Sequence, residues 1–146
     1  IEIYTQRDDL IVDVEPYTIS GITKLSVDIS MPDLHEIRVM GAVDLFFSGF
    51  DSEEMEITID GAGDITGKDT IIDDLSITVD GAVNVNLKES ACTDAHIVIN
   101  GAGNVDLTMA GGILSGRIDG LGKINYAGEV AEQTVRLHGL GSVERR

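Results

Sequence analysis

The stretch EITIDGAGDITG at residues 56–67 decides the fold, because five related versions of it occur in the same chain. The six versions begin at positions 36, 56, 76, 96, 115 and 134, so successive versions are separated first by 20 residues and then by 19. A fixed period of this length is typical of a solenoid, in which each repeat forms one coil stacked on the previous one. The versions read EIRVMGAVDLFF, EITIDGAGDITG, SITVDGAVNVNL, HIVINGAGNVDL, SGRIDGLGKINY and TVRLHGLGSVER.

Apolar and polar residues alternate within each version. In the third version the apolar residues Ile77, Val79 and Val83 occupy odd-numbered positions, whereas the polar residues Asp80 and Asn84 occupy even-numbered positions. A period of two residues predicts an extended strand with one face in the core and one face in water. Glycines at fixed offsets predict a bend in the middle of each version. These structural glycines are Gly41, Gly61, Gly81, Gly101, Gly120 and Gly139.

We therefore predict an all-β fold, a single-stranded parallel β-helix of about six coils of 19–20 residues. Residues 1–146 are expected to form one domain, with the six repeats at 36–146. Residues 1–35 are expected to supply capping strands, because an open end of a solenoid exposes unpaired backbone and must be covered.

Three short runs support the cap. Alternating residues at 1–5 and 10–15 flank the turn residues Asp8-Asp9, and Leu25, Val27 and Ile29 alternate before Pro32. We expect three phenylalanines in the first repeat to plug the end of the solenoid beneath these strands. They are Phe46, Phe47 and Phe50.

The charge of the chain limits its partners. Its 26 acidic and 10 basic residues give a formal net charge of −16, which disfavours nucleic acid as a ligand because phosphate contacts require clustered Lys and Arg. Residues 117–146 hold 5 of the bases and 4 of the acids, so this end is nearly neutral. No run approaches the roughly 20 apolar residues of a membrane span, and we predict no membrane insertion. The single cysteine, Cys92, is expected to be a buried hydrophobe.

Alignment of the repeats produces two outward polar columns. A ligand strip for Ca²⁺ or for sugar hydroxyls is one interpretation of them. The other, which we favour, is structural: Asp and Asn prefer positions beside glycine and form amide ladders on stacked coils. No cofactor is predicted, apart from this hypothesis of Ca²⁺. The residues of the hypothetical strip are Asp60, Asp64, Asp80, Asn84, Asn100, Asn104 and Asp119.

A further column contains small or aliphatic residues. If it faces outward it is an apolar stripe that would dock the N-terminal segment or a second copy of the chain. The alternative is that the neighbouring glycines turn these side chains into a corner. Contacts between solenoid ends are a second route to a homo-oligomer. The column is Ala42, Ala62, Ala82, Ala102, Leu121 and Leu140.

No catalytic or metal-binding arrangement is predicted. His96 aligns with polar residues and is expected to face solvent, whereas His35 aligns with Met55 and is expected at the end of the core. His138 lies close in register to Asp119, but we interpret it as a solvated surface histidine. The sequence contains no recognisable nucleophile triad, phosphate loop or metal-ligand spacing.

The segment LSVDISMPDLHEIRVMGA at residues 25–42, followed by repeated DGAGD and NGAGN units, resembles the bacterial family called putative auto-transporter adhesin, head GIN domain. The resemblance covers roughly residues 25–146. It implies a right-handed parallel β-helix and a cell-surface or secreted role, and it brings no catalytic residues. Leu121 and Leu140 depart from the alanine of the unit, so the last two coils are expected to differ in shape.

These observations favour a non-catalytic, adhesin-like module outside the cytoplasm, in the periplasm, at the outer membrane surface or secreted. A glycan or a protein at the cell surface would be its partner. The alternatives are a polysaccharide lyase or hydrolase, which would use acidic residues of the columns, and a glycan-binding domain assisted by Ca²⁺.

Overall fold

The computed structural model describes residues 2–13 and 26–146. The chain divides into two compact units, Ile1–Ser30 and Met31–Arg146, each with its own internal contacts. All regular structure in the described residues is β-strand, in agreement with the predicted all-β class. The capping role of residues 1–35 stays a prediction.

The first unit contains a β-hairpin. Strand β1 (Glu2–Gln6) pairs antiparallel with β2 (Asp9–Asp13). The chain reverses between them, where Arg7 has a φ of 59°. The hairpin predicted from the two alternating runs is confirmed, with its turn one residue earlier than Asp8-Asp9.

The alternation of Leu25, Val27 and Ile29 predicts a third N-terminal strand, and this prediction is wrong where the structure describes the segment. Residues 26–30 belong to no strand, and Leu25 lies outside the described residues. An alternating run becomes a strand only when a neighbouring backbone edge pairs with it. None of the described strands pairs with residues 26–30.

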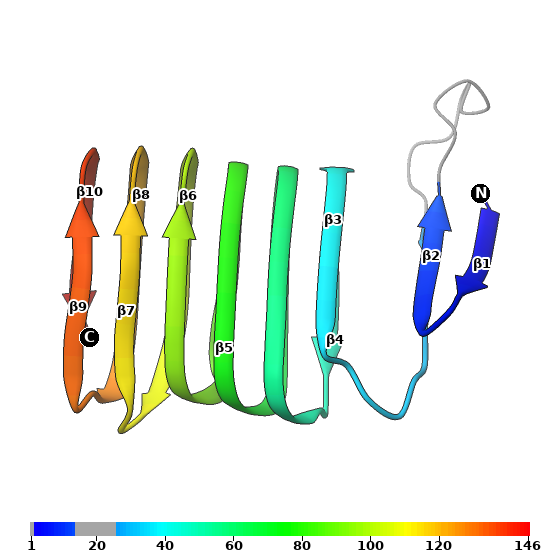
Figure 1. The fold of residues 1–146 in the computed structure, drawn as a ribbon, viewed down its shortest axis with the longest axis horizontal. Helices are drawn as coiled ribbons and strands as arrows, with labels where there is room; N and C mark the ends of the chain where they lie inside the picture. Colours follow the sequence, from blue (N-terminus) through cyan, green and yellow to red (C-terminus); the bar gives the residue numbers. More distant parts are fainter. Residues whose placement is uncertain (1, 14–25) are drawn as a thin grey trace. The chain divides into compact units, whose positions relative to one another are not determined.

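The second unit is a parallel β-solenoid (Figure 1). All its described strand pairs are parallel. Strand β5 is 49 residues long and passes around several bends without interruption. The strands are β3 (Glu36–Ala42), β4 (Leu45–Ser48), β5 (Asp51–Ile99), β6 (Ala102–Ala110), β7 (Ile113–Ile118), β8 (Leu121–Glu129), β9 (Glu132–Leu137) and β10 (Leu140–Arg145).

Each coil has two sides joined by a bend at the glycines. The first side is made by β3, parts of β5, β7 and β9, and the second by β4, other parts of β5, β6, β8 and β10. In Figure 1 the chain rises along the nearer side, crosses at the top and descends on the farther side while the solenoid advances from β3 to β9. This winding is right-handed, as the family resemblance implies.

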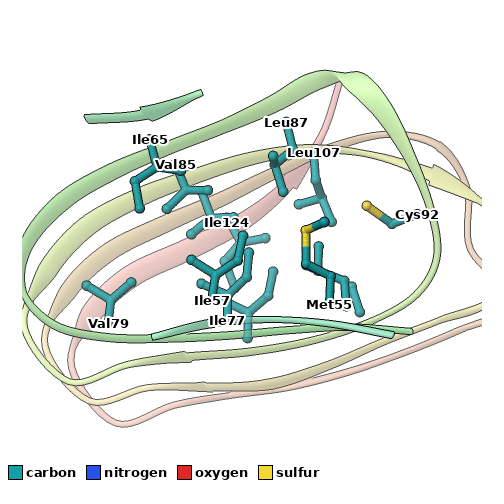
Figure 2. Close-up of a cluster of buried hydrophobic side chains, with 14 of the residues drawn as sticks. Met55, Ile57, Ile65, Ile77, Val79, Val85, Leu87, Cys92, Leu107 and Ile124 are labelled. Atoms are coloured by element: carbon teal, nitrogen blue, oxygen red, sulfur yellow. The ribbon is translucent and has the colours of Figure 1, made fainter. Parts of the chain in front are cut away.

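Equivalent residues of successive repeats lie opposite one another. The side chains that point inward, at every second position of each strand, fill the interior of the coil. Met55 and Ile57 point from the first side toward Val85 and Leu107 on the second (Figure 2). Burying one such aliphatic side chain stabilises a fold by roughly 1.5–3 kcal/mol, so these columns are the main source of stability. The most completely buried large side chains are Met55, Ile57, Ile59, Ile65, Ile72, Ile77, Leu87, Ile97, Ile99, Leu107, Leu114 and Ile118.

Two residues near the first coil differ from expectation. Phe47 is buried and packs against Phe50, with ring centroids 6.4 Å apart, but Phe46 is 61% exposed. Phe46 pairs with Thr66 in an outward column, so alternation along β4 turns it away from the core. His35 is also exposed, because it precedes β3 and the parity of the strand does not apply to it.

The change of period from 20 to 19 residues has a local cause. Leu87 pairs with Leu107, but the next pair joins Ala91 to Thr108, so residues 88–90 bulge out of the ladder. The following coil lacks these three residues but has two extra residues in its closing turn, near Gly111. It is therefore one residue shorter than the coil before it. The side chain of Asp94 fixes that turn by accepting a hydrogen bond of 2.6 Å from the backbone N–H of Ile113.

The structural glycines stack directly along the bend. A Cβ atom on Gly61, Gly81, Gly101, Gly120 or Gly139 would overlap the carbonyl oxygen of the preceding glycine in the column. Only a residue without a side chain allows successive backbones to approach this closely. The glycine column therefore sets the shape of the bend through steric contact between coils.

Substituting Gly81 tests this account. We expect Gly81→Ala to lower the free energy of unfolding by about 3 kcal/mol, since its methyl group meets backbone that cannot give way. Gly49→Ala is the control: Gly49 has a φ of 80° but no atom within 4 Å of an added Cβ, so strain alone should cost about 1 kcal/mol. Urea unfolding measures both, and equal losses would contradict the steric explanation.

Candidate functional site

The first polar column stands on the first side of the solenoid, just before the bend, and all its side chains are exposed. Asn100 donates a hydrogen bond of 2.8 Å to Asp80. Asp119 accepts from Arg117 at 3.0 Å and also contacts Nδ1 of His138 at 3.0 Å. Asn100 thus separates the carboxylates of Asp80 and Asp119, whereas Asp60 and Asp80 are direct neighbours in the column. The column is Met40, Asp60, Asp80, Asn100, Asp119 and His138.

The second polar column lies just beyond the bend and forms a ladder of hydrogen bonds. The amide of Asn84 donates to Asp64 at 2.9 Å, and the amide of Asn104 donates to Asn84 at 3.0 Å. Interspersed amides relieve the repulsion that stacked carboxylates would have at the spacing of adjacent strands. The column is Asp44, Asp64, Asn84, Asn104, Lys123 and Ser142.

Lys123 carries positive charge into the second polar column. Its ammonium group forms an ion pair of 2.7 Å with Glu144. Hydrogen bonds from Lys123 and then from Ser142 lower the pKa of the Glu144 carboxyl. The C-terminal end of this column is therefore cationic and hydroxylic, whereas its N-terminal end is acidic.

The hypothetical ligand strip does not converge on one point. Its residues divide between the two columns, on opposite sides of the bend. Among residues 2–13 and 26–146, no group of three or more His, Cys, Asp or Glu side chains is arranged to hold a metal ion. The ladders satisfy much of the hydrogen-bonding capacity of the strip within the protein.

The alanine and leucine column faces outward, which rules out the corner interpretation, whereas docking of the N-terminal segment or of a second copy on it stays a prediction. All six side chains are exposed, including Leu121 at 58% and Leu140 at 79%. The bend turns them out because the preceding residue in each repeat is a glycine packed against its neighbour. We call this set the apolar stripe; its members are Ala42, Ala62, Ala82, Ala102, Leu121 and Leu140.

A shallow axial groove lies beside the bend and crosses four successive coils. Its volume is about 650 Å³. One bank is made by residues of the apolar stripe and the opposite bank by residues of the second polar column. The floor between them is formed by Val83, Gly103, Gly122 and Gly141. The lining residues are Ala82, Val83, Asn84, Ala102, Gly103, Asn104, Leu121, Gly122, Lys123, Leu140, Gly141 and Ser142.

The two columns that form the banks were found in the sequence, but the groove between them was not. Alternation assigns both columns to the outward parity without saying that the surface between them is hollow. The glycines at positions 103, 122 and 141 give no such signal, because a Cβ added there would contact backbone or core atoms. The groove is lined by no carboxylate, so it can bind through apolar contact, through neutral hydrogen bonds and through the ammonium group of Lys123.

Other chemically active residues lie apart from the groove. His96 faces solvent, as predicted, with Nδ1 at 3.0 Å from the hydroxyl of Ser115. Cys92 is fully buried, as predicted, and burial raises the pKa of its thiol to about 12. A thiol in this state is not a nucleophile near neutral pH.

Comparisons with known proteins agree with this architecture. The profile of the family described as "Putative auto-transporter adhesin, head GIN domain" matches residues 1–107. The matched range includes the N-terminal hairpin and ends before the last two repeats, whereas the sequence resemblance covers residues 25–146. No match was found among curated proteins. Within the described part of the chain, no helix has the length and apolarity of a membrane span.

The amide ladder predicts a charge-dependent effect at Asn84. Asn84→Asp removes the donor to Asp64 and places two carboxylates on adjacent strands. We expect a loss of about 1 kcal/mol in unfolding free energy at low ionic strength, which shrinks in high salt because salt screens exposed charges. Asn84→Ser, which loses the amide without adding charge, is the matched control. A salt-independent loss in Asn84→Asp would contradict the electrostatic role of the ladder.

A metal titration tests the alternative role of the columns. We expect Ca²⁺ to raise the Tm no more than Mg²⁺ does at equal ionic strength, since both ions would only screen the acidic surface. Differential scanning calorimetry of the chain freed of metal by a chelator measures the shifts. A saturable increase with Ca²⁺ alone would establish a specific site.

Proposed function

Because the chain belongs to the family described as putative auto-transporter adhesin, head GIN domain, we propose that it is a non-catalytic, adhesin-like module that acts outside the cytoplasm. We further propose that its ligand is an extended glycan chain, which lies along the axial groove. The family description supports a role at the cell surface, and the groove supports the kind of ligand.

The observation that carries this proposal is the contrast between the two banks of the groove. Leu121 and Leu140 offer exposed aliphatic surface on one bank, while Asn104 and Ser142 offer donors and acceptors on the other. A sugar ring has an apolar C–H face and a rim of hydroxyl groups, so its two surfaces match the two banks. A groove that crosses four coils suits a chain of sugars rather than a single small molecule.

The hydrogen-bonding groups of the groove are also held in place. Asn84 and Asn104 are fixed by the amide ladder, and Lys123 is fixed by its ion pair with Glu144. Each ladder amide uses one N–H group within the protein, and the second remains for a ligand. Because these side chains are already ordered, binding would lose little conformational entropy.

Several features support a non-catalytic role over a lyase or hydrolase. Glycoside hydrolysis commonly requires two carboxyl groups on either side of the bond that breaks, and the groove is lined by none. The carboxylates of Asp64 and Asp80 accept hydrogen bonds from the next coil, and that of Asp119 pairs with Arg117 of its own coil. These groups serve the ladder and the surface charge, and they are not gathered around a substrate cavity.

The test is binding to an array of immobilised oligosaccharides. We expect Leu140→Ser to weaken the glycan interaction about tenfold, because the substitution removes aliphatic surface from one bank. Ile71→Ser is the matched control, since Ile71 is exposed to 55% but lies outside the groove. An equal loss in the control, or capture of proteins but of no glycan, would overturn the proposed ligand.

The same oligosaccharides show whether the domain is catalytic. After prolonged incubation with the protein, with and without Ca²⁺, we expect no new reducing ends and no unsaturated products. Turnover that depends on Asp60, Asp64, Asp80 or Asp119 would favour the lyase or hydrolase alternative.

A further inference from the structure

A second hollow lies on the first side of the solenoid, where β5, β7 and β9 lie next to one another. Its volume is about 400 Å³. Two arginines and a histidine line it, in a chain whose net charge is −16. We call it the basic hollow; its lining residues are His96, Val98, Ser115, Gly116, Arg117, Thr134 and Arg136.

The hollow coincides with an irregularity of the core. Gly116 occupies an inward position that Ile97 fills in the preceding coil and Val135 fills in the next. A Cβ atom at Gly116 would overlap the carbonyl oxygen of Ile97, and Gly116 has a φ of 140°. The backbone of β7 therefore approaches the preceding coil more closely here than a residue with a side chain would permit, and the outer surface at this position is concave.

Two like charges meet in the hollow. Arg117 lies opposite Arg136 in the parallel register of β7 and β9. Like charges on directly opposite residues of adjacent strands destabilise a sheet unless a counter-charge lies between them. Arg117 has such a partner in Asp119, at 3.0 Å. Arg136 takes part in none of the ion pairs or side-chain hydrogen bonds found among the described residues.

Neutral donors surround the arginines. The hydroxyls of Ser115 and Thr134 lie on adjacent strands in the same row as His96. Ser115 contacts His96 Nδ1 at 3.0 Å, and Thr134 donates to Glu132 at 3.1 Å. Among the described residues, Asp119 and Glu132 are the carboxylates that form ion pairs or hydrogen bonds with the lining residues. Each already accepts from one of them, which leaves the guanidinium of Arg136 as an uncompensated charge.

We propose that the basic hollow binds an oxyanion, a carboxylate, sulfate or phosphate group, held by Arg136 with support from Arg117 and the neighbouring hydroxyls. A guanidinium binds such groups through two parallel N–H bonds, and a bound oxyanion would supply the missing counter-charge between the two arginines. The site lies on a different side of the solenoid from the axial groove, so it does not depend on the glycan proposal. The acidic remainder of the chain repels anions, which makes binding specific to this hollow.

The experiment follows backbone amide signals by NMR during titration with sodium sulfate, with sodium chloride at equal ionic strength as the reference. We expect saturable shifts at Gly116 and Thr134. Arg136→Gln should weaken sulfate binding about tenfold, the effect of losing charge-assisted hydrogen bonds. Arg38→Gln is the matched control, because Arg38 occupies the same column in the first coil, pairs with Glu36 at 2.6 Å and lies outside the hollow.

Each result decides the proposal. Saturable shifts that Arg136→Gln abolishes and Arg38→Gln leaves unchanged would support it. Shifts that do not saturate, that chloride reproduces, or that persist in Arg136→Gln would overturn it. Both variants alter exposed side chains, and an unchanged Tm shows that each remains folded.

Two further titrants identify the source of the group. A sulfated oligosaccharide and a uronate oligosaccharide are compared with inorganic sulfate at the same concentration of oxyanion. Tighter binding of either oligosaccharide, lost in Arg136→Gln, would assign the hollow to an anion carried on a polymer. Equal affinity for inorganic sulfate would assign it to a free ion.

Discussion

The close approach of successive backbones at the bend is the constraint on which the second unit depends. Each glycine of the column rests against the carbonyl oxygen of the preceding one, so no side chain fits between them. The strands that flank the bend stay in register from coil to coil, so the alternation of inward and outward side chains is kept on both sides. The aliphatic core, the apolar stripe and the second polar column all take their positions from this contact.

Stacking of the coils brings like charges close together on the surface of the solenoid. A repeat places the same residue type in every coil, so one acidic position becomes a row of like charges at the spacing of adjacent strands, about 4.8 Å. The chain answers with amides at Asn84, Asn100 and Asn104, and with ion pairs such as that of Lys123. A side chain that forms such a hydrogen bond or ion pair with its neighbour is also held in one position.

Much of the fold could be predicted from the sequence, because the period and the alternation are global properties. They establish the coils, the inward columns, the outward columns and the hairpin before the repeats. They do not determine positions where the repeat is interrupted. The exposure of His35, the bulge at residues 88–90 and the lack of a strand at residues 26–30 depend on what each segment can pair with, and alternation carries no information about that partner.

The two hollows were missed for a related reason. Both coincide with glycines, and a glycine in a pattern indicates only that a side chain is absent. An added Cβ would meet neighbouring atoms at Gly81 and at Gly122 alike, so the hollows depend on how the outward side chains of successive coils are placed. Sequence reasoning found the residues of the banks, and the structure was needed to find the concave surface between them.

The bulge at residues 88–90 allows the length of a coil to change without a change of register along the bend. Coils on its two sides differ by one residue in length, yet the rows along the bend stay in register, with Ala82 opposite Ala102 and Ala102 opposite Leu121. The difference is absorbed entirely on the side where each coil closes. For a ligand that lies along the axis, the spacing between successive rows of side chains is therefore set by the separation of the strands and not by the number of residues per coil. Insertions and deletions on the closing side therefore leave the spacing of the residues along the bend unchanged, so the sequence of the closing side can vary without altering that surface.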